Sequence, residues 1–244
     1  MFVLERERLA AGDRVVLEGT EGRHAATVRR LAQGEAVVLT DGCGFSAQCL
    51  VVSVGRDRLE LAVEARVETT PPQPRLVVVQ ALPKGDRGEL AVGTMTEVGV
   101  DVIVPWAAAR CVTRWEGARG EKALARWGTT VREAAKQSRR SRFPEVTGLV
   151  STDEVVAMLR SAALPVVLHE EATAALATLS GAELPAHGDV VVVVGPEGGL
   201  TTEELSAFGA AGATACRLGP TVLRTSTAGA AAVAVLLSRT ARWA

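Results

Sequence analysis

The stretch from Val190 to Leu205, VVVVVGPEGGLTTEEL, constrains the fold more than any other part of the chain. Five consecutive valines without alternation are typical of a strand buried on both faces, as in a parallel sheet covered by helices. Thr201 and Glu204 have the spacing of a capping box, which predicts that a helix begins directly after the loop. A strand, a glycine-rich loop and a helix in this order indicate an α/β domain. Ligands usually bind such sheets at the carboxyl ends of the strands.

The loop at residues 195–199, GPEGG, has the composition of a ligand-binding turn. Three glycines leave the backbone open to close approach by another molecule. No lysine follows, as a phosphate-binding P-loop requires, and the dinucleotide motif GxGxxG is missing from the loop. Glu197 would repel a phosphate, so we expect a ligand with positive charge or N–H donors. A tight turn that binds nothing is the alternative.

Turn signals divide the 244 residues into two parts. Strand-like runs at 35–40, 46–54 and 57–67 predict a small β-barrel or sandwich over residues 1–70, and the proline-rich segment 69–74 is typical of an extended linker. Over residues 75–244 the pattern alternates between strands and helices, which indicates a mostly parallel sheet. The expected strands are 76–81, 100–105, 165–168, 190–194 and 215–218, and the expected helices lie near 86–98, 118–139, 152–163, 171–179, 201–211 and 226–240.

Two further features concern the helices of the α/β part. Ser151 and Glu154 repeat the capping-box spacing before the helix expected at 152–163. The last expected helix is alanine-rich and apolar on most faces, so we expect it to be buried, in part against another subunit.

The composition indicates where the protein is located in the cell and whether it binds a metal. Hydrophobic residues make up 48% of the chain, but no apolar run reaches the length of a membrane span. The N-terminal residues MFVLERERLA carry charge where a signal peptide would be apolar, so we expect a cytoplasmic protein. The four cysteines form no CxxC pair and have no histidine at metal-ligand spacing. We therefore expect reduced thiols and no bound metal.

The net charge of −1 hides a basic region in the middle of the chain. Residues 75–142 contain 13 Lys and Arg against 7 Asp and Glu. The densest part is REAAKQSRRSR, residues 132–142, in which Arg132, Lys136, Arg139 and Arg140 would share one face if the helix continued through them. Such a face could grip the phosphates of a nucleic acid. A solvated helix surface is the alternative.

Two more polar segments follow expected strands. LGPTVLRTSTA, residues 218–228, offers Arg224 and several hydroxyl groups close to a helix start. LHEE, residues 168–171, places His169 directly after another strand. We expect the loops to face one pocket at the edge of the sheet, with His169 in its wall.

Taken together, these motifs resemble those of the bacterial 16S ribosomal RNA (uracil-N3)-methyltransferases of the SPOUT superfamily, and the resemblance covers nearly the whole chain. The matching segments are ALPKGDR (81–87), TEVGVDVIVP (96–105), REAAKQSRRSRFPEV (132–146), LHEE (168–171), VGPEGGLTTEEL (194–205) and LGPTVLRTSTA (218–228). The segment RHAATVRRLAQGEAVVLTDGCG (23–44) is similar to the PUA-like barrel of the same family.

The resemblance implies an α/β fold with a SPOUT-type parallel sheet and a deep trefoil knot, preceded by a PUA-like barrel that binds RNA. Such knots are rare exceptions to the rule that chains do not thread their own loops. It also implies S-adenosyl-L-methionine as cofactor, a homodimer, and 16S rRNA of the small ribosomal subunit as partner. The implied cofactor-binding residues are Leu168, His169, Glu170, Gly195, Pro196, Glu197, Gly198, Gly199, Leu218, Gly219, Val222, Leu223, Arg224 and Thr225. The implied RNA-binding residues are Arg23, Arg29, Arg30, Lys84, Arg87, Arg132, Lys136, Arg139, Arg140 and Arg142.

The implied reaction is direct transfer of a methyl group to N3 of a uridine near the 3′ end of the rRNA, in the decoding region. N3 carries a proton at neutral pH, so a base or a stabiliser of the uridine anion is needed. Arg224 is expected to stabilise the anion or to bind the cofactor carboxylate, and Glu197 or a water to take the proton. Family members usually have glutamate at the position of Ser226, an acidic residue at that of Lys136 and glycine at that of Arg139.

Two other readings stay open. One is a different methyltransferase of the same knotted class, which would act on ribose 2′-hydroxyl groups or on transfer RNA. The other is an RNA-binding module without catalytic activity, against which the GPEGG loop speaks. An oxidoreductase that uses a dinucleotide is disfavoured because its fingerprint is missing.

Overall fold

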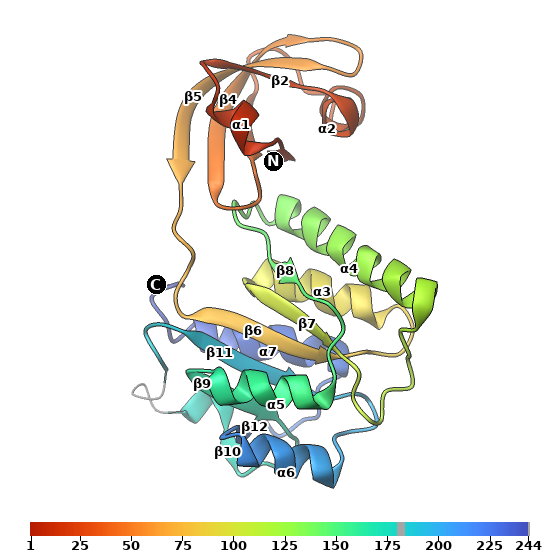
Figure 1. The fold of residues 1–244 in the computed structure, drawn as a ribbon. Helices are drawn as coiled ribbons and strands as arrows, with labels where there is room; N and C mark the ends of the chain where they lie inside the picture. Colours follow the sequence, from red (N-terminus) through yellow and green to blue (C-terminus); the bar gives the residue numbers. More distant parts are fainter. Residues whose placement is uncertain (180–183, 244) are drawn as a thin grey trace. The chain divides into compact units, whose positions relative to one another are not determined.

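The computed structural model describes residues 1–179 and 184–243 (Figure 1). It divides into two compact units. Unit 1 consists of Met1–Pro71 and Ala135–Phe143, and unit 2 consists of Pro72–Ala134 and Pro144–Ala244. The arginine-rich segment 135–143 thus belongs to the same unit as the N-terminal residues.

Unit 1 is built on a five-stranded sheet with the strand order β1-β3-β4-β5-β2. Its long strands pair antiparallel, and β1 pairs parallel with β3. Apolar residues that alternate along these strands, such as Leu59 and Leu61, are fully buried and form the core. The elements are β1 (Phe2–Val3), α1 (Arg6–Ala10), β2 (Arg14–Leu17), α2 (Gly19–Arg23), the π-helical turn η1 (His24–Val28), β3 (Ala36–Thr40), β4 (Phe45–Val54) and β5 (Leu59–Glu68).

The segment 135–143 adds to the β3–β4 hairpin of unit 1 through main-chain contacts. The carbonyl oxygen of Ser141 accepts hydrogen bonds from the Thr40 hydroxyl at 2.9 Å and from the Gly44 N–H at 2.9 Å. Arg142 forms a β-bridge with Cys43. These contacts hold the segment as part of the fold of unit 1.

Unit 2 contains a seven-stranded sheet, all parallel, with the order β10-β12-β9-β11-β6-β7-β8. The valine strand β11 lies between β9 and β6, and its valines are at most 2% exposed. Helices α3 and α7 cover one face of the sheet, and α5 and α6 cover the other (Figure 1). The strands are β6 (Arg75–Ala81), β7 (Val102–Trp106), β8 (Glu145–Val146), β9 (Leu164–Leu168), β10 (Ala174–Ala175), β11 (Asp189–Val194) and β12 (Thr214–Arg217); the helices are α3 (Arg87–Val98), α4 (Gly117–Gln137), α5 (Thr152–Ser161), α6 (Thr202–Ala210) and α7 (Thr225–Leu237).

Both predicted capping boxes are confirmed. In each, the hydroxyl of the first residue accepts the N–H of the glutamate three positions later, and that carboxylate accepts the N–H of the first residue. Thr201 and Glu204 begin α6, and Ser151 and Glu154 begin α5. The predicted α/β class is confirmed as well, whereas the knot stays a prediction.

The helix expected at 171–179 is wrong. Residues 174–175 form the short strand β10, which pairs parallel with β12, and Leu176–Thr178 form a single 3-10 turn, η2. The alanines of this segment favour a helix, but pairing with the edge of the sheet and burial of Leu176 outweigh that weak preference. Across the described residues, no helix is both long and apolar enough to cross a membrane.

Candidate active site

Three loops of unit 2 meet at the carboxyl ends of neighbouring strands. β9 leads into residues 169–170, β11 into residues 195–200, and β12 into residues 218–224. Because β12, β9 and β11 are adjacent and parallel, their carboxyl ends lie at one edge of the sheet. The predicted convergence of LHEE, GPEGG and LGPTVLRTSTA is confirmed.

The loops enclose a pocket of about 300 Å³. That volume is at the lower end of the range for sites that bind a small molecule or cofactor. The predicted cofactor-binding residues that line it are Leu168, His169, Glu170, Gly195, Pro196, Glu197, Gly199, Leu218, Gly219, Val222, Leu223, Arg224 and Thr225. Gly198 is not among the lining residues.

The GPEGG loop is a tight turn with an open backbone. The Gly199 N–H donates to the Pro196 carbonyl at 2.9 Å, and Gly199 has φ +70°, a conformation that favours glycine. Pro196 is buried, so the turn is packed against the fold. The bare backbone of this turn forms one wall of the pocket.

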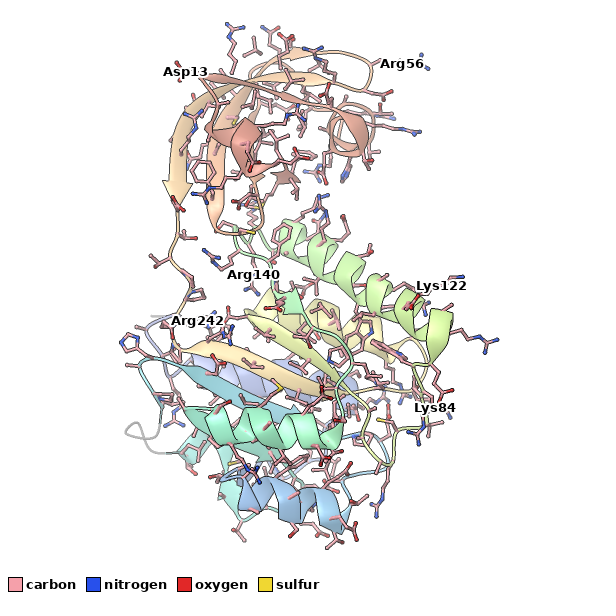
Figure 2. The ribbon with its side chains drawn as sticks, viewed as in Figure 1. Asp13, Arg56, Lys84, Lys122, Arg140 and Arg242 are labelled. Carbon is pink, nitrogen blue, oxygen red and sulfur yellow. The ribbon has the colours of Figure 1, made fainter. Side chains whose placement is uncertain are left out.

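Glu197 is held by the loop that follows β6. Its Oε1 accepts the Lys84 N–H at 3.2 Å and lies 3.6 Å from the Arg87 guanidinium. The carboxylate is thus partly neutralised by its neighbours. Figure 2 shows Lys84 beyond the carboxyl end of β6, on the same side as the pocket loops.

Arg224 lies at the end of the third loop, directly before α7. Its side chain is exposed, lines the pocket and makes no hydrogen bond or ion pair with another described residue. The Arg224 carbonyl accepts the N–H groups of Thr227 and Ala228, which begins the helix. An exposed guanidinium that faces the pocket can pair with a carboxylate or with a developing anion of a bound molecule.

The first turn of α7 is anchored on β6. Gln80 is buried, and its Nε2 donates to the carbonyl oxygens of Ala81 at 3.0 Å and Thr225 at 3.3 Å. Ser226, at the position of the usual family glutamate, is only 3% exposed. The end of the third loop is therefore held against the buried core by the hydrogen bond from Gln80.

His169 stands in the pocket wall, as expected. Its main-chain N–H donates to the Cys216 carbonyl at 2.9 Å, which continues the pairing of β9 with β12. Its Nδ1 accepts the Glu171 N–H at 3.2 Å, so the neutral ring carries its proton on Nε2. These bonds fix both the backbone and the ring of His169.

The expected single helical face of basic residues is wrong. α4 ends at Gln137, and Arg139 has φ +59°, so Arg139 and Arg140 lie beyond the helix. Lys136 is only 6% exposed, and its Nζ lies 3.0 Å from Glu21 Oε1. The helical spacing failed because the chain turns away from the helix at this point to join the β3–β4 hairpin.

The remaining basic residues of unit 1 differ in exposure. Arg142 donates from Nη2 to the Thr69 carbonyl, and Arg140 donates from Nε to the Arg142 carbonyl; both arginines are half-buried. The exposed ones are Arg23, Arg29, Arg30 and Arg139. In unit 2, Lys84, Arg87 and Arg132 are exposed.

Two of these exposed arginines, which are far apart in sequence, act on the same N-terminal amine. Burial lowers the pKa of the Met1 amine, and the positive charges of Arg29, Lys136 and Arg139 lower it further. Arg29 and Arg139 therefore contribute to one cationic region of unit 1. Glu21 offsets part of this charge through its pair with Lys136.

Several residues of the site were not predicted from their sequence patterns. Arg217 and Thr221 line the pocket, Gln80 anchors α7, and Arg110 contacts the GPEGG loop. Gln80 has a signal, since it is the one polar residue in the apolar run LVVVQA. Arg110 has no such signal, because it lies after a strand without any motif that predicts binding. Among the described residues, no group of three or more His, Cys, Asp or Glu side chains is placed to hold a metal ion.

Comparison with known families assigns both parts of the chain. Residues 70–237 match the RNA methyltransferase domain family, and residues 17–64 match the RNA methyltransferase PUA domain family. Ribosomal RNA small subunit methyltransferase E of Mycobacterium bovis is 49% identical over 232 residues, which cover 93% of this chain and 87% of that protein. The protein of the same name from Bacillus subtilis is 30% identical, over 92% of this chain and 90% of its own.

Solved structures agree with this assignment. The ribosomal RNA small subunit methyltransferase E of Neisseria gonorrhoeae, bound to S-adenosyl methionine, superposes with a TM-score of 0.84 at 29% identity and covers 97% of this chain and 96% of that one. A putative methyltransferase of Legionella pneumophila in complex with the same cofactor also gives 0.84, at 27% identity, over 98% of this chain and 97% of that one. The chain therefore belongs to the ribosomal RNA small subunit methyltransferase E family, and it is an rRNA methyltransferase.

Proposed function

We propose that the pocket of unit 2 binds S-adenosyl-L-methionine and that the protein methylates N3 of a uridine in 16S rRNA of the small ribosomal subunit, in the decoding region near the 3′ end. The observation that carries the proposal is the convergence of the three loops around one pocket of about 300 Å³. Thirteen of the fourteen residues that we expected to bind the cofactor line it.

The residues present suit this cofactor. The glycine-rich wall admits close approach of a flat adenine and its ribose, with main-chain groups available for hydrogen bonds. The exposed guanidinium of Arg224 suits the carboxylate of the methionine part. Glu197 lines the pocket with a negative charge, which suits a sulfonium better than a phosphate.

When bound, S-adenosyl-L-methionine supplies a methyl group on a positively charged sulfur, which leaves with the bonding electrons as N3 takes the methyl. The chain's own residues position the acceptor base, whose N3 proton must leave before or during the transfer. The other role open to Arg224, in place of pairing with the cofactor carboxylate, is to stabilise the negative charge that develops on the uracil ring. Because the Glu197 carboxylate is already engaged by Lys84 and Arg87, a water is the better acceptor for the proton.

The exposed basic residues would bind the RNA backbone. Exposure supports this role for seven of the expected residues, namely Arg23, Arg29, Arg30 and Arg139 in unit 1 and Lys84, Arg87 and Arg132 in unit 2. Lys136 is removed from this set by its burial, and Arg140 and Arg142 contribute less because their side chains are half-buried. We further propose a cytoplasmic homodimer with a knotted cofactor loop, which rests on the family resemblance.

The test is methylation of purified small ribosomal subunits with labelled cofactor, followed by mapping of the modified base. We expect one N3-methyluridine near the 3′ end of 16S rRNA. A modified ribose or a modified transfer RNA would identify a different methyltransferase of this class. Binding of RNA without binding of S-adenosylhomocysteine would identify a non-catalytic module.

Two variants separate the roles of the residues. Arg224→Ala should abolish or strongly reduce methyl transfer and leave RNA binding intact. Arg29→Glu with Arg139→Glu should weaken RNA binding and flatten its dependence on salt, while affinity for S-adenosylhomocysteine holds. Arg56→Glu, on an exposed arginine elsewhere in unit 1, is the matched control.

A further inference from the structure

The segment after β7 contacts the GPEGG loop from outside the pocket. Arg110 donates from Nη1 to the carbonyl oxygens of Gly198 and Leu200, both at 3.1 Å. Gly199, between these two residues, lines the pocket, whereas Arg110 does not. One guanidinium nitrogen therefore binds the carbonyl oxygens of the two residues on either side of Gly199.

The packing at this contact is tight enough that a side chain at position 198 would have to displace Arg110 by a few tenths of an ångström. A Cβ atom on Gly198 would lie 3.1 Å from the Arg110 Cβ and 3.3 Å from the Arg110 carbonyl oxygen. The backbone of Arg110 thus lies directly against Gly198. This explains why Gly198, alone among the predicted residues of the loop, is absent from the pocket wall.

The neighbouring residue of the same segment is tied to the helix that follows the loop. Glu204 Oε1 accepts the Ala109 N–H at 2.8 Å, while its Oε2 accepts the Thr201 N–H at 2.9 Å. Glu204 is only 4% exposed, and it is part of the capping box of α6. The segment is therefore fixed beside Arg110, so the guanidinium is presented at a defined place.

We propose that Arg110 is a positioning residue for the cofactor. Arg110 donates hydrogen bonds to the Gly198 and Leu200 carbonyl oxygens and so keeps both carbonyl groups directed toward its guanidinium. This fixes the orientation of the Gly199 backbone in the pocket wall. A hydrogen bond to a charged donor is stronger than one between neutral groups, which suits this role. Preorganisation of the loop then lowers the ordering cost of cofactor binding. The inference rests on the proposed cofactor site.

The experiment compares Arg110→Met and Arg110→Lys with the unaltered protein. Calorimetry with S-adenosylhomocysteine gives the dissociation constant, and steady-state methylation of small ribosomal subunits gives kcat and the KM for each substrate. We expect Arg110→Met to raise the dissociation constant and the KM for the cofactor about tenfold, because the loop loses both charge-assisted hydrogen bonds and must be ordered when the cofactor binds. The KM for the ribosomal subunit should not change.

Arg110→Lys keeps a charged donor and should recover part of the affinity. Arg114→Met is the matched control, since Arg114 is an exposed arginine of the same segment; it should bind S-adenosylhomocysteine as the unaltered protein does. If Arg110→Met does not fold, Arg110→Ala, which also lacks the donor, is compared with the unaltered protein, and an equal affinity overturns the proposal.

Failure of this inference can be told from failure of the proposed function. If the unaltered protein does not bind S-adenosylhomocysteine, the cofactor site itself is wrong. If it binds and Arg110→Met binds equally well, only the role of Arg110 is wrong. A fall in kcat with unchanged cofactor KM would also overturn the positioning role.

Discussion

The Lys136 ammonium lies 3.0 Å from the Glu21 carboxylate in unit 1, and the Lys136 side chain is buried whereas that of Glu21 is half-buried, at 5% and 15% exposure. The pair joins the segment 135–143 to α2, which lies more than a hundred residues earlier in the chain. Lys136, which the basic run predicts to bind phosphate, is therefore paired with a carboxylate within unit 1. The charge available to RNA is smaller than the sequence suggests.

Replacing Lys136 with methionine should destabilise unit 1 by roughly 2 kcal/mol, because the half-buried Glu21 carboxylate would lose the positive charge beside it. The measurement is urea denaturation of the full chain. Adding Glu21→Gln should recover most of the loss, since the uncompensated charge is then gone. Lys122→Met, on an exposed lysine of the same helix (Figure 2), is the control and should change the free energy of unfolding little.

Gly44→Ala should destabilise the β3–β4 hairpin by roughly 2 kcal/mol or more. Gly44 has φ +103°, and an added Cβ would lie 2.3 Å from the Arg142 Nη2 and 2.9 Å from the Thr69 carbonyl oxygen. Gly55→Ala is the matched control, because its nearest neighbour would be at 3.4 Å and its φ is ordinary. Equal melting temperatures for the two variants would contradict the close packing of Arg142 on the hairpin.

The thiol of Cys49 should make the stability of unit 1 depend on alkaline pH. Burial raises the pKa of this thiol to about 11. Since its pKa in the folded state exceeds that in the unfolded state, the thiol contributes stability that is fully present below its ordinary pKa and is lost as the pH rises toward about 11. Melting curves of Cys49→Ala should therefore show a weaker loss of stability over this pH range than those of the unaltered protein.

The same burial predicts the order in which the cysteines react. At neutral pH a maleimide should label Cys43, which is exposed, well before Cys49 or Cys111, which are buried and whose pKa values are raised by burial. Mass spectrometry of a time course would show the order. Rapid labelling of Cys49 in the folded protein would contradict its position in the core.

Removal of the Arg242 side chain should destabilise unit 2 by roughly 2–4 kcal/mol. Its guanidinium lies 2.6 Å from Asp101, which is only 8% exposed, and it also donates to the carbonyl oxygens of Pro74 and Gly99. Figure 2 shows Arg242 near the amino end of β6, opposite the pocket end. Arg242→Ala should therefore lower the melting temperature but leave the affinity for S-adenosylhomocysteine unchanged. Arg160→Ala, on an exposed arginine of α5, is the control.

Most elements of unit 2 could be predicted because their signals are local. The valine run needs no partner to be recognised as a doubly buried strand, and the two capping boxes depend on side chains only three residues apart. The pocket loops follow from these strands, since parallel neighbours end at the same edge. Only the segment 171–179 went against its local preference, because its pairing partner β12 lies about forty residues later.

The sequence by itself determined the α/β class, the three-loop pocket and the helix starts, because each depends on hydrophobic periodicity or on contacts within one turn. The tertiary structure alone decided which charged residues are available. Lys136 pairs with Glu21, Glu197 accepts the Lys84 N–H, and Arg110 donates to the Gly198 carbonyl. The two partners of each interaction are far apart in the sequence. The energy of a charged group depends on its burial and on its partner, and both are set only when distant segments pack together.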